Sequence, residues 1–276
     1  MDVSKAKVVI IVLLAAFNIF LLSSNLSHVR SQNTSEIISN TVTILKQRGV
    51  TLECGIPKEI GTFHGLKYAD GKLDRASIAE KLLGSTYESP DKGGVYENSG
   101  KKLEFTGDMK FVFTEAPLSS GFDLQNNVKL KKAVQDFLKG TGLIDKNYVI
   151  DQYSRNQDGS VTIYFIEKYE NYLVYDNYCK VSLTAEGIAR LDYSKYQIIG
   201  FSSAKIVQTE AYQALLAYFK DGANKTLTGI DCGYILENEN LGGKDVEIPP
   251  VWRVKVKGES EPVFLNAETT ENKTAQ

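Results

Sequence analysis

The sequence predicts an α+β protein with an N-terminal transmembrane helix, followed by two related lobes of antiparallel sheet with packed helices. Three observations lead to this prediction. The first 26 residues hold a nearly unbroken apolar run. Behind it, segments rich in Tyr, Val and Ile are separated by turn dipeptides, which is typical of antiparallel strands. Helical patterns lie between those segments. With 276 residues, of which 42% are hydrophobic, the chain is long enough to bury a sizeable core.

The apolar run at the N-terminus predicts a membrane anchor. Residues 8–22 read VVIIVLLAAFNIFLL, and Asn18 is their only polar residue. Extended to residues 6–26, the run reaches the roughly 20 residues that a spanning helix needs. Its end lacks a pair of small residues at signal-peptidase spacing, so we favour an uncleaved anchor over a removed signal peptide. Lys5 and Lys7 predict a single-pass protein of the cell membrane with a cytoplasmic N-terminus and an extracytoplasmic C-terminal part.

Asn18 also predicts a contact surface within the anchor. Helical spacing places it on one face with Ile11, Leu14, Leu22 and Asn25. A hydrogen bond from a membrane asparagine to another helix contributes about 0.6–2 kcal/mol. We therefore predict that this face binds a partner helix. The alternative interpretation is an asparagine that is tolerated near the membrane interface.

The part of the chain after the anchor alternates helical with strand-like segments. The predicted helices cover residues 34–47, 74–83, 126–138 and 209–219. The predicted strands cover residues 50–52, 95–115 (as a meander), 148–154, 161–170, 172–184, 188–199, 229–237, 251–257 and 263–266. Asp74 and Thr209 are the expected N-caps of two helices. Asp158-Gly159 is typical of the turns between the strands.

The order of helix, antiparallel strands, helix and strands recurs in both halves, which predicts two lobes. The predicted segments are a cytoplasmic stub and anchor over 1–26, a first lobe over 27–120, a second lobe over 121–267, and a polar tail over 268–276. Both lobes are expected outside the cytoplasm.

Charge and motifs exclude several classes of function. Lys and Arg total 32 against 34 Asp and Glu, a formal net charge of -2, so nucleic acid is not an expected partner. No Walker loop, GxGxxG or EF-hand pattern occurs, and we expect no cofactor. The three cysteines, Cys54, Cys179 and Cys232, lack CxxC spacing, so no metal site is expected. They allow at most one disulfide, with the pairing open.

Catalytic residues are scarce, and we predict that the protein is not an enzyme. Cys54 and His64 are ten residues apart, which permits a Cys-His pair without any recognisable nucleophile signature. Two carboxylate pairs with glycosidase potential are Glu167 with Glu170 and Glu237 with Glu239. A structural thiol, a surface histidine and solvated acids at strand ends are the favoured interpretations.

A group of tyrosines on consecutive predicted strands suggests a recognition surface. It consists of Tyr172, Tyr175, Tyr178, Tyr193 and Tyr196. A tyrosine-rich sheet forms a protein interface or a platform for carbohydrate. The competing interpretation is ordinary sheet packing with the hydroxyl groups at the surface.

Motifs at both ends of the chain match one known family. At the N-terminal end the matching residues are Met1, Asp2, Ser4, Lys5, Lys7, Asn18, Phe20 and Leu21. Towards the C-terminal end they are GYIL at 233–236, PPVWRV at 249–254 and FLNAET at 264–269. With these motifs the chain resembles the YycI (WalI) family of Gram-positive bacteria, although Val3 stands where that family usually has tryptophan. The segment 50–125 resembles the family only in pattern.

The resemblance implies a regulatory rather than a chemical function. Proteins of this family are bitopic accessory factors of the WalK/WalR (YycG/YycF) two-component system and act with YycH (WalH). The implied partners are therefore a sensor histidine kinase of the WalK/YycG type and a YycH-like accessory protein. The implied function is control of kinase activity, and hence of cell-wall metabolism, through transmembrane and outer-domain contacts. The alternative from the residues is an extracytoplasmic binding module for a cell-wall glycan or peptide.

Overall fold

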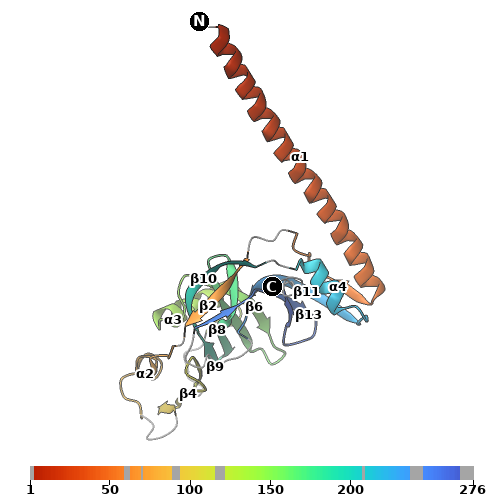
Figure 1. Ribbon diagram of the computed structural model, residues 1–276. Coiled ribbons are helices and arrows are strands. Elements are labelled where there is room, and N and C mark those ends of the chain that lie inside the picture. The colour runs from red at the N-terminus through yellow and green to blue at the C-terminus, as the bar shows by residue number, and fades with distance from the viewer. Residues whose placement is uncertain are drawn as a thin grey trace. The chain divides into compact units, whose positions relative to one another are not determined.

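The computed structural model describes residues 3–58, 63–69, 71–88, 94–115, 122–206, 209–236 and 245–267, without the side chains of helix residues 3–11 and 21–33. It is an α+β structure with mostly antiparallel strands, as predicted (Figure 1). The chain forms two compact units, each assembled from separate segments. The described residues of unit 1 lie within Met1–Gly61, Thr209–Asp231 and Trp252–Thr269, and those of unit 2 lie within Thr62–Gln208 and Cys232–Val251.

Unit 1 begins with one long helix, α1 (Val3–Gln47). The sequence predicted two separate helical segments here, but residues 27–33 contain neither Gly nor Pro and the helix continues through them. Leu45 and Thr41 are buried where α1 contacts β1 and α4. Gly49, at φ 80°, ends the helix where the sequence suggested.

The rest of unit 1 consists of strands and one short helix. It contains β1 (Val50–Leu52), α4 (Ala211–Tyr218), the first part of β11 (Lys225–Tyr234), β13 (Val251–Val256) and β14 (Val263–Asn266). β1 pairs in parallel with the start of β11. Thr209 was predicted as the N-cap of α4, but Glu210 holds that position, and Gln213 Oε1 accepts from its backbone N–H at 3.1 Å. The Thr209 N–H instead donates to the Ala267 carbonyl at 2.7 Å.

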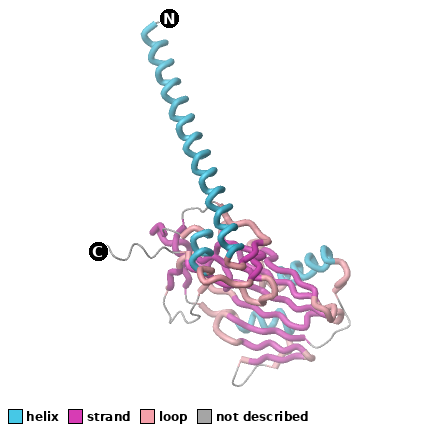
Figure 2. Tube along the Cα trace, turned by 90° about the vertical axis from the view of Figure 1, so that its right-hand side faces the viewer, coloured by secondary structure: helices cyan, strands magenta, loops and turns pink. Residues whose placement is uncertain are grey.

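Unit 2 is built on a large antiparallel sheet with strand order β3-β4-β5-β9-β8-β7-β6, whose strands lie side by side in Figure 2. The strands are β3 (Val95–Asn98), β4 (Lys101–Phe105), β5 (Lys110–Glu115), β6 (Tyr148–Arg155), β7 (Val161–Tyr169), β8 (Tyr172–Thr184) and β9 (Gly187–Ser194). Helices α2 (Arg75–Leu83) and α3 (Asn127–Gly140) pack on one face. Their buried residues, including Leu82, Leu130 and Val134, join the apolar core with Phe113 and Phe165 of the sheet.

The division into units differs from the predicted lobe boundary near residue 120. β5 precedes that boundary and β9 follows it, yet the two strands pair directly from Lys110 opposite Ser194 to Thr114 opposite Arg190. The segments predicted as separate lobes therefore contribute to one sheet. A meander and a set of hairpins give no local sign that they will pair with each other, since pairing between distant strands is not encoded in turn residues.

A second sheet in unit 2 is three-stranded, with order β10-β2-β12. Its strands are β10 (Gln197–Ile206), β2 (Phe63–Ala69) and β12 (Val246–Ile248). The sequence merged β9 and β10 into one strand over 188–199. The chain leaves the first sheet between them because Asn177 bonds both backbone groups of Tyr196: its Oδ1 accepts from N–H at 2.6 Å, and its Nδ2 donates to the carbonyl at 3.0 Å.

Candidate functional site

The predicted membrane face lies on α1. Of its five residues, Leu14 and Asn18 have described side chains, whereas those of Ile11, Leu22 and Asn25 lie outside the described residues. Asn18 Nδ2 donates to the Leu14 carbonyl of its own helix at 2.9 Å. An asparagine amide also offers a second N–H and an acceptor oxygen. This bond is therefore compatible with a further contact, and partner binding by this face stays a prediction.

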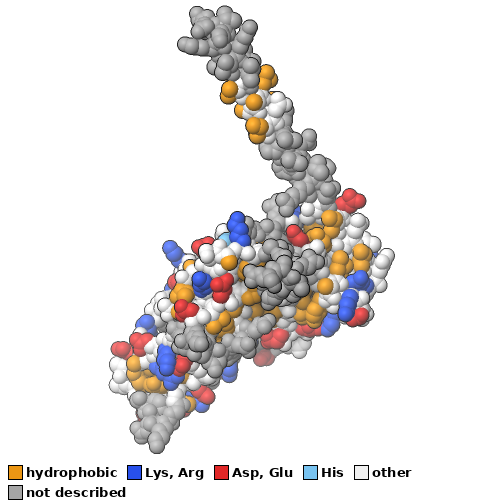
Figure 3. Space-filling model, in the orientation of Figure 1, with side chains coloured by type: hydrophobic (Ala, Val, Ile, Leu, Met, Phe, Trp, Pro, Cys, Tyr) orange, Lys and Arg blue, Asp and Glu red, His pale blue; other side chains and the backbone are white. Residues whose placement is uncertain are grey.

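The described middle of α1 is strongly apolar at its surface. Over residues 12–20, six large hydrophobic side chains are 55–69% exposed, and they show as hydrophobic spheres along the helix in Figure 3. They are Val12, Leu13, Leu14, Phe17, Ile19 and Phe20. Within the residues that the structure describes, no helix carries an apolar stretch long enough to cross a membrane.

The Cys54–His64 pair does not have the environment of a catalytic dyad. Cys54 follows β1 in unit 1 and is half-buried, and this burial raises its thiol pKa. An activated cysteine needs the opposite shift, because the thiolate is the nucleophile. His64 lies on β2 in unit 2, and its backbone carbonyl accepts a hydrogen bond from the Tyr234 hydroxyl at 2.7 Å.

Cys179 is equally unsuited to nucleophilic chemistry. Cys179 is fully buried in the core of unit 2, and its pKa is raised by that burial. No disulfide joins Cys54, Cys179 or Cys232, all of which the structure describes. Across the described residues, no group of histidines, cysteines and acids is arranged to hold a metal ion.

Of the two carboxylate pairs, the one that the structure describes, Glu167 with Glu170, does not have the surroundings of a glycosidase site. Glu167 is buried on β7 and accepts a hydrogen bond from Asn177 Nδ2 at 2.6 Å. Glu170 lies in the turn after β7, with φ 52°. The other pair, Glu237 and Glu239, lies outside the described residues. Glu167 therefore has a structural role in the interior, where it binds the same Asn177 amide that holds the backbone at Tyr196.

The five predicted tyrosines separate into buried and accessible members. Tyr175, Tyr193 and Tyr196 are buried. Tyr178 is half-exposed and stacks on Tyr164, with ring centroids 5.3 Å apart and planes at 19°. Tyr164 alternates with the core residues of β7, so this stack lies on the sheet face opposite α2 and α3.

Tyr172 belongs to a different aromatic group. Its ring lies 5.3 Å from Phe63, 5.8 Å from Phe201 and 5.7 Å from Tyr234. Neither Tyr164 nor Phe201 was predicted from the sequence as part of an aromatic group. Alternation within each strand was the available signal for Tyr164, because it places that residue on the outward face.

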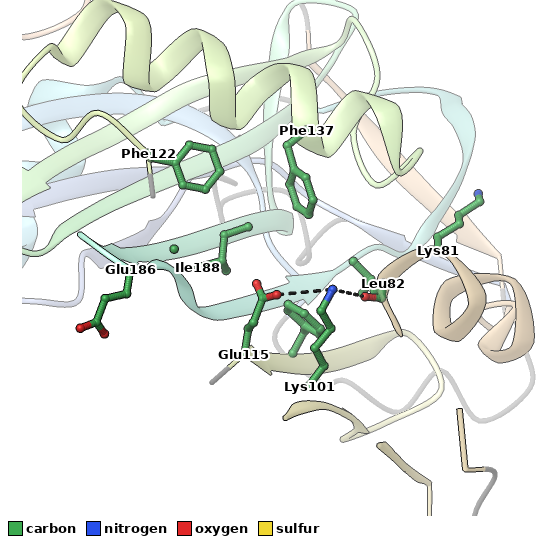
Figure 4. Close-up of a pocket in the computed structure, with 10 residues that line it drawn as sticks. Lys81, Leu82, Lys101, Glu115, Phe122, Phe137, Glu186 and Ile188 are labelled. Atoms are coloured by element: carbon green, nitrogen blue, oxygen red, sulfur yellow. Dashed lines mark hydrogen bonds and ion pairs between the residues drawn. The ribbon is translucent and has the colours of Figure 1, made fainter. Parts of the chain in front are cut away.

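Unit 2 also contains a pocket of about 250 Å³ at the C-terminal end of α2 (Figure 4). Its apolar wall consists of Leu82, Phe113, Phe122, Phe137 and Ile188. Its charged residues are Lys81 and Lys101, with Glu115 and Glu186. No sequence motif predicted this pocket, because its residues come from both helices, from three strands and from connecting segments.

One ion pair forms the polar floor of the pocket. Lys101 and Glu115 are directly opposite on β4 and β5, and their charged atoms lie 3.4 Å apart. Lys101 Nζ also donates to the Leu82 carbonyl at 3.5 Å, which satisfies an otherwise unbonded group at the end of α2. Figure 4 shows both contacts, with the Phe122 and Phe137 rings across from them.

The C-terminal residues that carry the family resemblance have structural roles. A Cβ on Gly233 would lie 2.8 Å from the Tyr175 ring, so β11 reaches β8 only with glycine there. Trp252 is buried and donates from Nε1 to the Thr209 carbonyl at 2.9 Å. Arg253 is buried and forms two hydrogen bonds with the Asp231 carboxylate, at 2.9 and 2.8 Å.

Comparisons with known proteins identify a family and a similar fold. A family model described as YycI protein matches residues 29–268. No curated protein matches the chain. The crystal structure of YycH from Bacillus subtilis is similar, with a TM-score of 0.51 and 15% sequence identity. The match covers 75% of this chain and 53% of that chain, so this chain spans about half the length of that structure. Similarity at this level of identity shows the fold alone.

Proposed function

Because the chain belongs to the YycI family, we propose that it is a non-enzymatic regulatory accessory of a two-component system that controls cell-wall metabolism. Its proposed partners are a sensor histidine kinase of the WalK/YycG type and a YycH-like accessory protein. The YycH-like fold supports this assignment at the level of architecture. Two observations are consistent with a non-enzymatic role. Burial raises the pKa of the Cys54 thiol, and Glu167 is hydrogen-bonded to Asn177 in the interior.

The proposal includes a single membrane anchor formed by the first part of α1. The observation that supports it is the surface of residues 12–20, where large apolar side chains are more than half exposed. In water such a surface is unfavourable by about 25 cal/mol for each Å² of apolar area, whereas a bilayer accommodates it. Lys5 and Lys7 orient the anchor with the N-terminus in the cytoplasm and both units outside.

The continuity of α1 suggests how the anchor and unit 1 act together. The helix runs without interruption from Val3 to Gln47. Its end is held by buried Leu45 and by Arg48, whose Nη1 donates to the Leu216 carbonyl of α4 at 2.9 Å. A contact that tilts or rotates the helix in the membrane therefore acts on unit 1 directly. We propose that regulation uses both transmembrane and outer-domain contacts.

The experiment that tests this function is co-purification of the full chain with the sensor kinase from membranes. Replacing Asn18 with leucine removes the amide while keeping the helix apolar, and we expect recovery of the kinase to fall by about threefold to tenfold, as for a lost bond of 0.6–1.4 kcal/mol. Phe20→Leu is the matched control, because position 20 lies about 200° around the helix from position 18. Unchanged recovery of the kinase with Asn18→Leu would contradict partner binding by the Asn18 face of the helix.

A second candidate function is binding of a cell-wall glycan or peptide, and the Tyr164–Tyr178 stack favours it. Two stacked and partly exposed rings on the sheet face opposite α2 and α3 offer aromatic surface of the kind that sugars contact. Co-sedimentation of the full chain with insoluble cell wall, compared with Tyr178→Ala, tests it directly. Equal sedimentation of both proteins would exclude the stack as the binding site.

A further inference from the structure

We propose that the pocket at the end of α2 binds one large apolar side chain of a partner protein, presented between an acidic residue near Lys81 and a basic residue near Glu186. The inference rests on the proposed function, since it gives a regulatory accessory a contact site outside its membrane helix. It concerns only unit 2, in which every lining residue lies.

The size of the pocket favours a side chain over a small-molecule ligand. Its volume of about 250 Å³ is below the roughly 300–1,000 Å³ of typical small-molecule pockets. Protein interfaces commonly place one buried anchor, often aromatic, in a pocket of the partner, and such anchors supply most of the binding energy. A bulky side chain therefore matches this volume better than an entire ligand.

The apolar wall is built for an aromatic or branched aliphatic group. Phe113 is fixed in the core of β5, whereas Phe122 and Phe137 are half-buried and present ring surface to the pocket. Figure 4 shows these two rings side by side above Ile188. Aromatic side chains pack favourably in offset or edge-to-face contact with such rings. Filling the pocket would remove this apolar surface from water.

The charged residues determine what enters and in which orientation. On the floor, Lys101 is neutralised by Glu115 and bonded to the end of α2, so the floor offers no unpaired charge to an entering group. Lys81 and Glu186 are exposed on different sides of the pocket (Figure 4), and neither has an ion-pair partner among the described residues. A segment with one acid and one base around its anchor complements this rim, which favours encounter and fixes orientation.

The test uses a peptide probe with the full chain in detergent micelles. The probe is the capped pentapeptide Asp-Ala-Phe-Ala-Lys, and the control peptide carries alanine in place of phenylalanine. Saturation-transfer NMR of the peptide signals measures binding. We expect the affinity of the alanine peptide to be at least about tenfold lower, as for loss of an interface anchor. Equal binding of the two peptides would overturn the proposal.

Variants of the chain locate the binding. Phe122→Trp adds ring volume at a half-buried wall position, and we expect it to abolish the difference between the two peptides. Lys81→Glu and Glu186→Lys each lower affinity for the phenylalanine peptide. The double exchange should instead bind the charge-reversed peptide Lys-Ala-Phe-Ala-Asp, because each end of that peptide again meets a rim residue of opposite charge. A double exchange that binds the charge-reversed peptide no better than the single variants do would contradict the assigned rim, even if Phe122→Trp failed to fold.

The same measurements separate this inference from the proposed function. Peptide binding depends on the pocket, whereas recovery of the kinase after Asn18→Leu depends on the membrane helix. Peptide binding without any recovery of the kinase by the natural chain would reject the proposed function and keep the pocket. Recovery of the kinase without a preference for the phenylalanine peptide would reject the pocket and keep the function.

Discussion

The two ends of the chain that resemble the YycI family differ in what their residues do. At the C-terminal end, Trp252 and Arg253 are buried and hydrogen-bonded within unit 1. At the N-terminal end, Asn18 lies on an exposed helix among exposed apolar side chains, and its described bond is to its own helix. The C-terminal motifs are therefore requirements of the fold. Asn18 has no such packing role among the described residues, and its contact with a partner helix stays a prediction.

The largest expected effect comes from Trp252. Trp252→Ala removes a buried aromatic side chain and the bond to the Thr209 carbonyl, so we expect a loss of about 3–5 kcal/mol in the free energy of unfolding. Trp252→Phe keeps a ring and should lose about 1–3 kcal/mol, the cost of an unsatisfied carbonyl. Urea unfolding followed by circular dichroism measures both, since the variants lack the only tryptophan. A loss below 1 kcal/mol for Trp252→Ala would contradict a structural role for the motif.

Removing the partner of Arg253 should have the next largest effect. Asp231→Ala leaves a buried guanidinium without its carboxylate, and we expect a loss of about 3 kcal/mol. The value lies at the low end for buried pairs because the Asp231 side chain is 33% exposed. Glu259→Ala, which removes a more exposed ion pair with Lys225, is the matched control and should change stability by less than about 1 kcal/mol. Similar losses for the two variants would show that burial does not distinguish the pairs.

Gly233 gives a smaller effect in unit 2. Gly233→Ala places a methyl group against the Leu173 carbonyl and the Tyr175 ring, and we expect a loss of about 1–3 kcal/mol. The same substitution at Gly55 is the control, because a Cβ there meets nothing within 4 Å. Thermal unfolding of both variants checks the difference. Equal unfolding midpoints for the two variants would contradict the close approach of β11 and β8 at Gly233.

The smallest effect on stability is expected at the N-terminal end. Ile37→Ser and Ile44→Ser alter exposed positions of α1 in unit 1, so each should stay within about 0.5 kcal/mol of the natural chain. Leu45→Ala, one position from Ile44 but buried, should lose about 2–5 kcal/mol. If the exposed isoleucines proved as costly as Leu45, this part of α1 would be packed against something that the described structure lacks.

Local signals in the sequence predicted the strands of unit 2 well. The predicted strand 172–184 has the bounds of β8, since the turns on both sides carry turn-forming residues. Gly159 adopts a positive φ of 83°, as the predicted Asp158-Gly159 turn suggested. The N-cap at Asp74 was also correct, and its side chain accepts from the Ser77 N–H at 3.1 Å.

Features that depend on distant contacts were missed for a common physical reason. β2 and β12 pair with strands far away in the sequence, so no neighbouring turn residues predict their pairing. The break between β9 and β10 is made by the Asn177 side chain rather than by a residue at the break. The pocket and the Tyr164–Tyr178 stack arise the same way, because each joins residues that only the folded sheet brings together.

The central claim is that the face of α1 containing Asn18 contacts a sensor kinase within the membrane. A photocrosslinking amino acid at position 18 of the full chain, compared with one at position 20, tests it most directly, because the two positions point about 200° apart. We predict crosslinks to the sensor kinase from position 18 and few or none from position 20. Equal crosslinking from both positions, or none from position 18, would contradict the account.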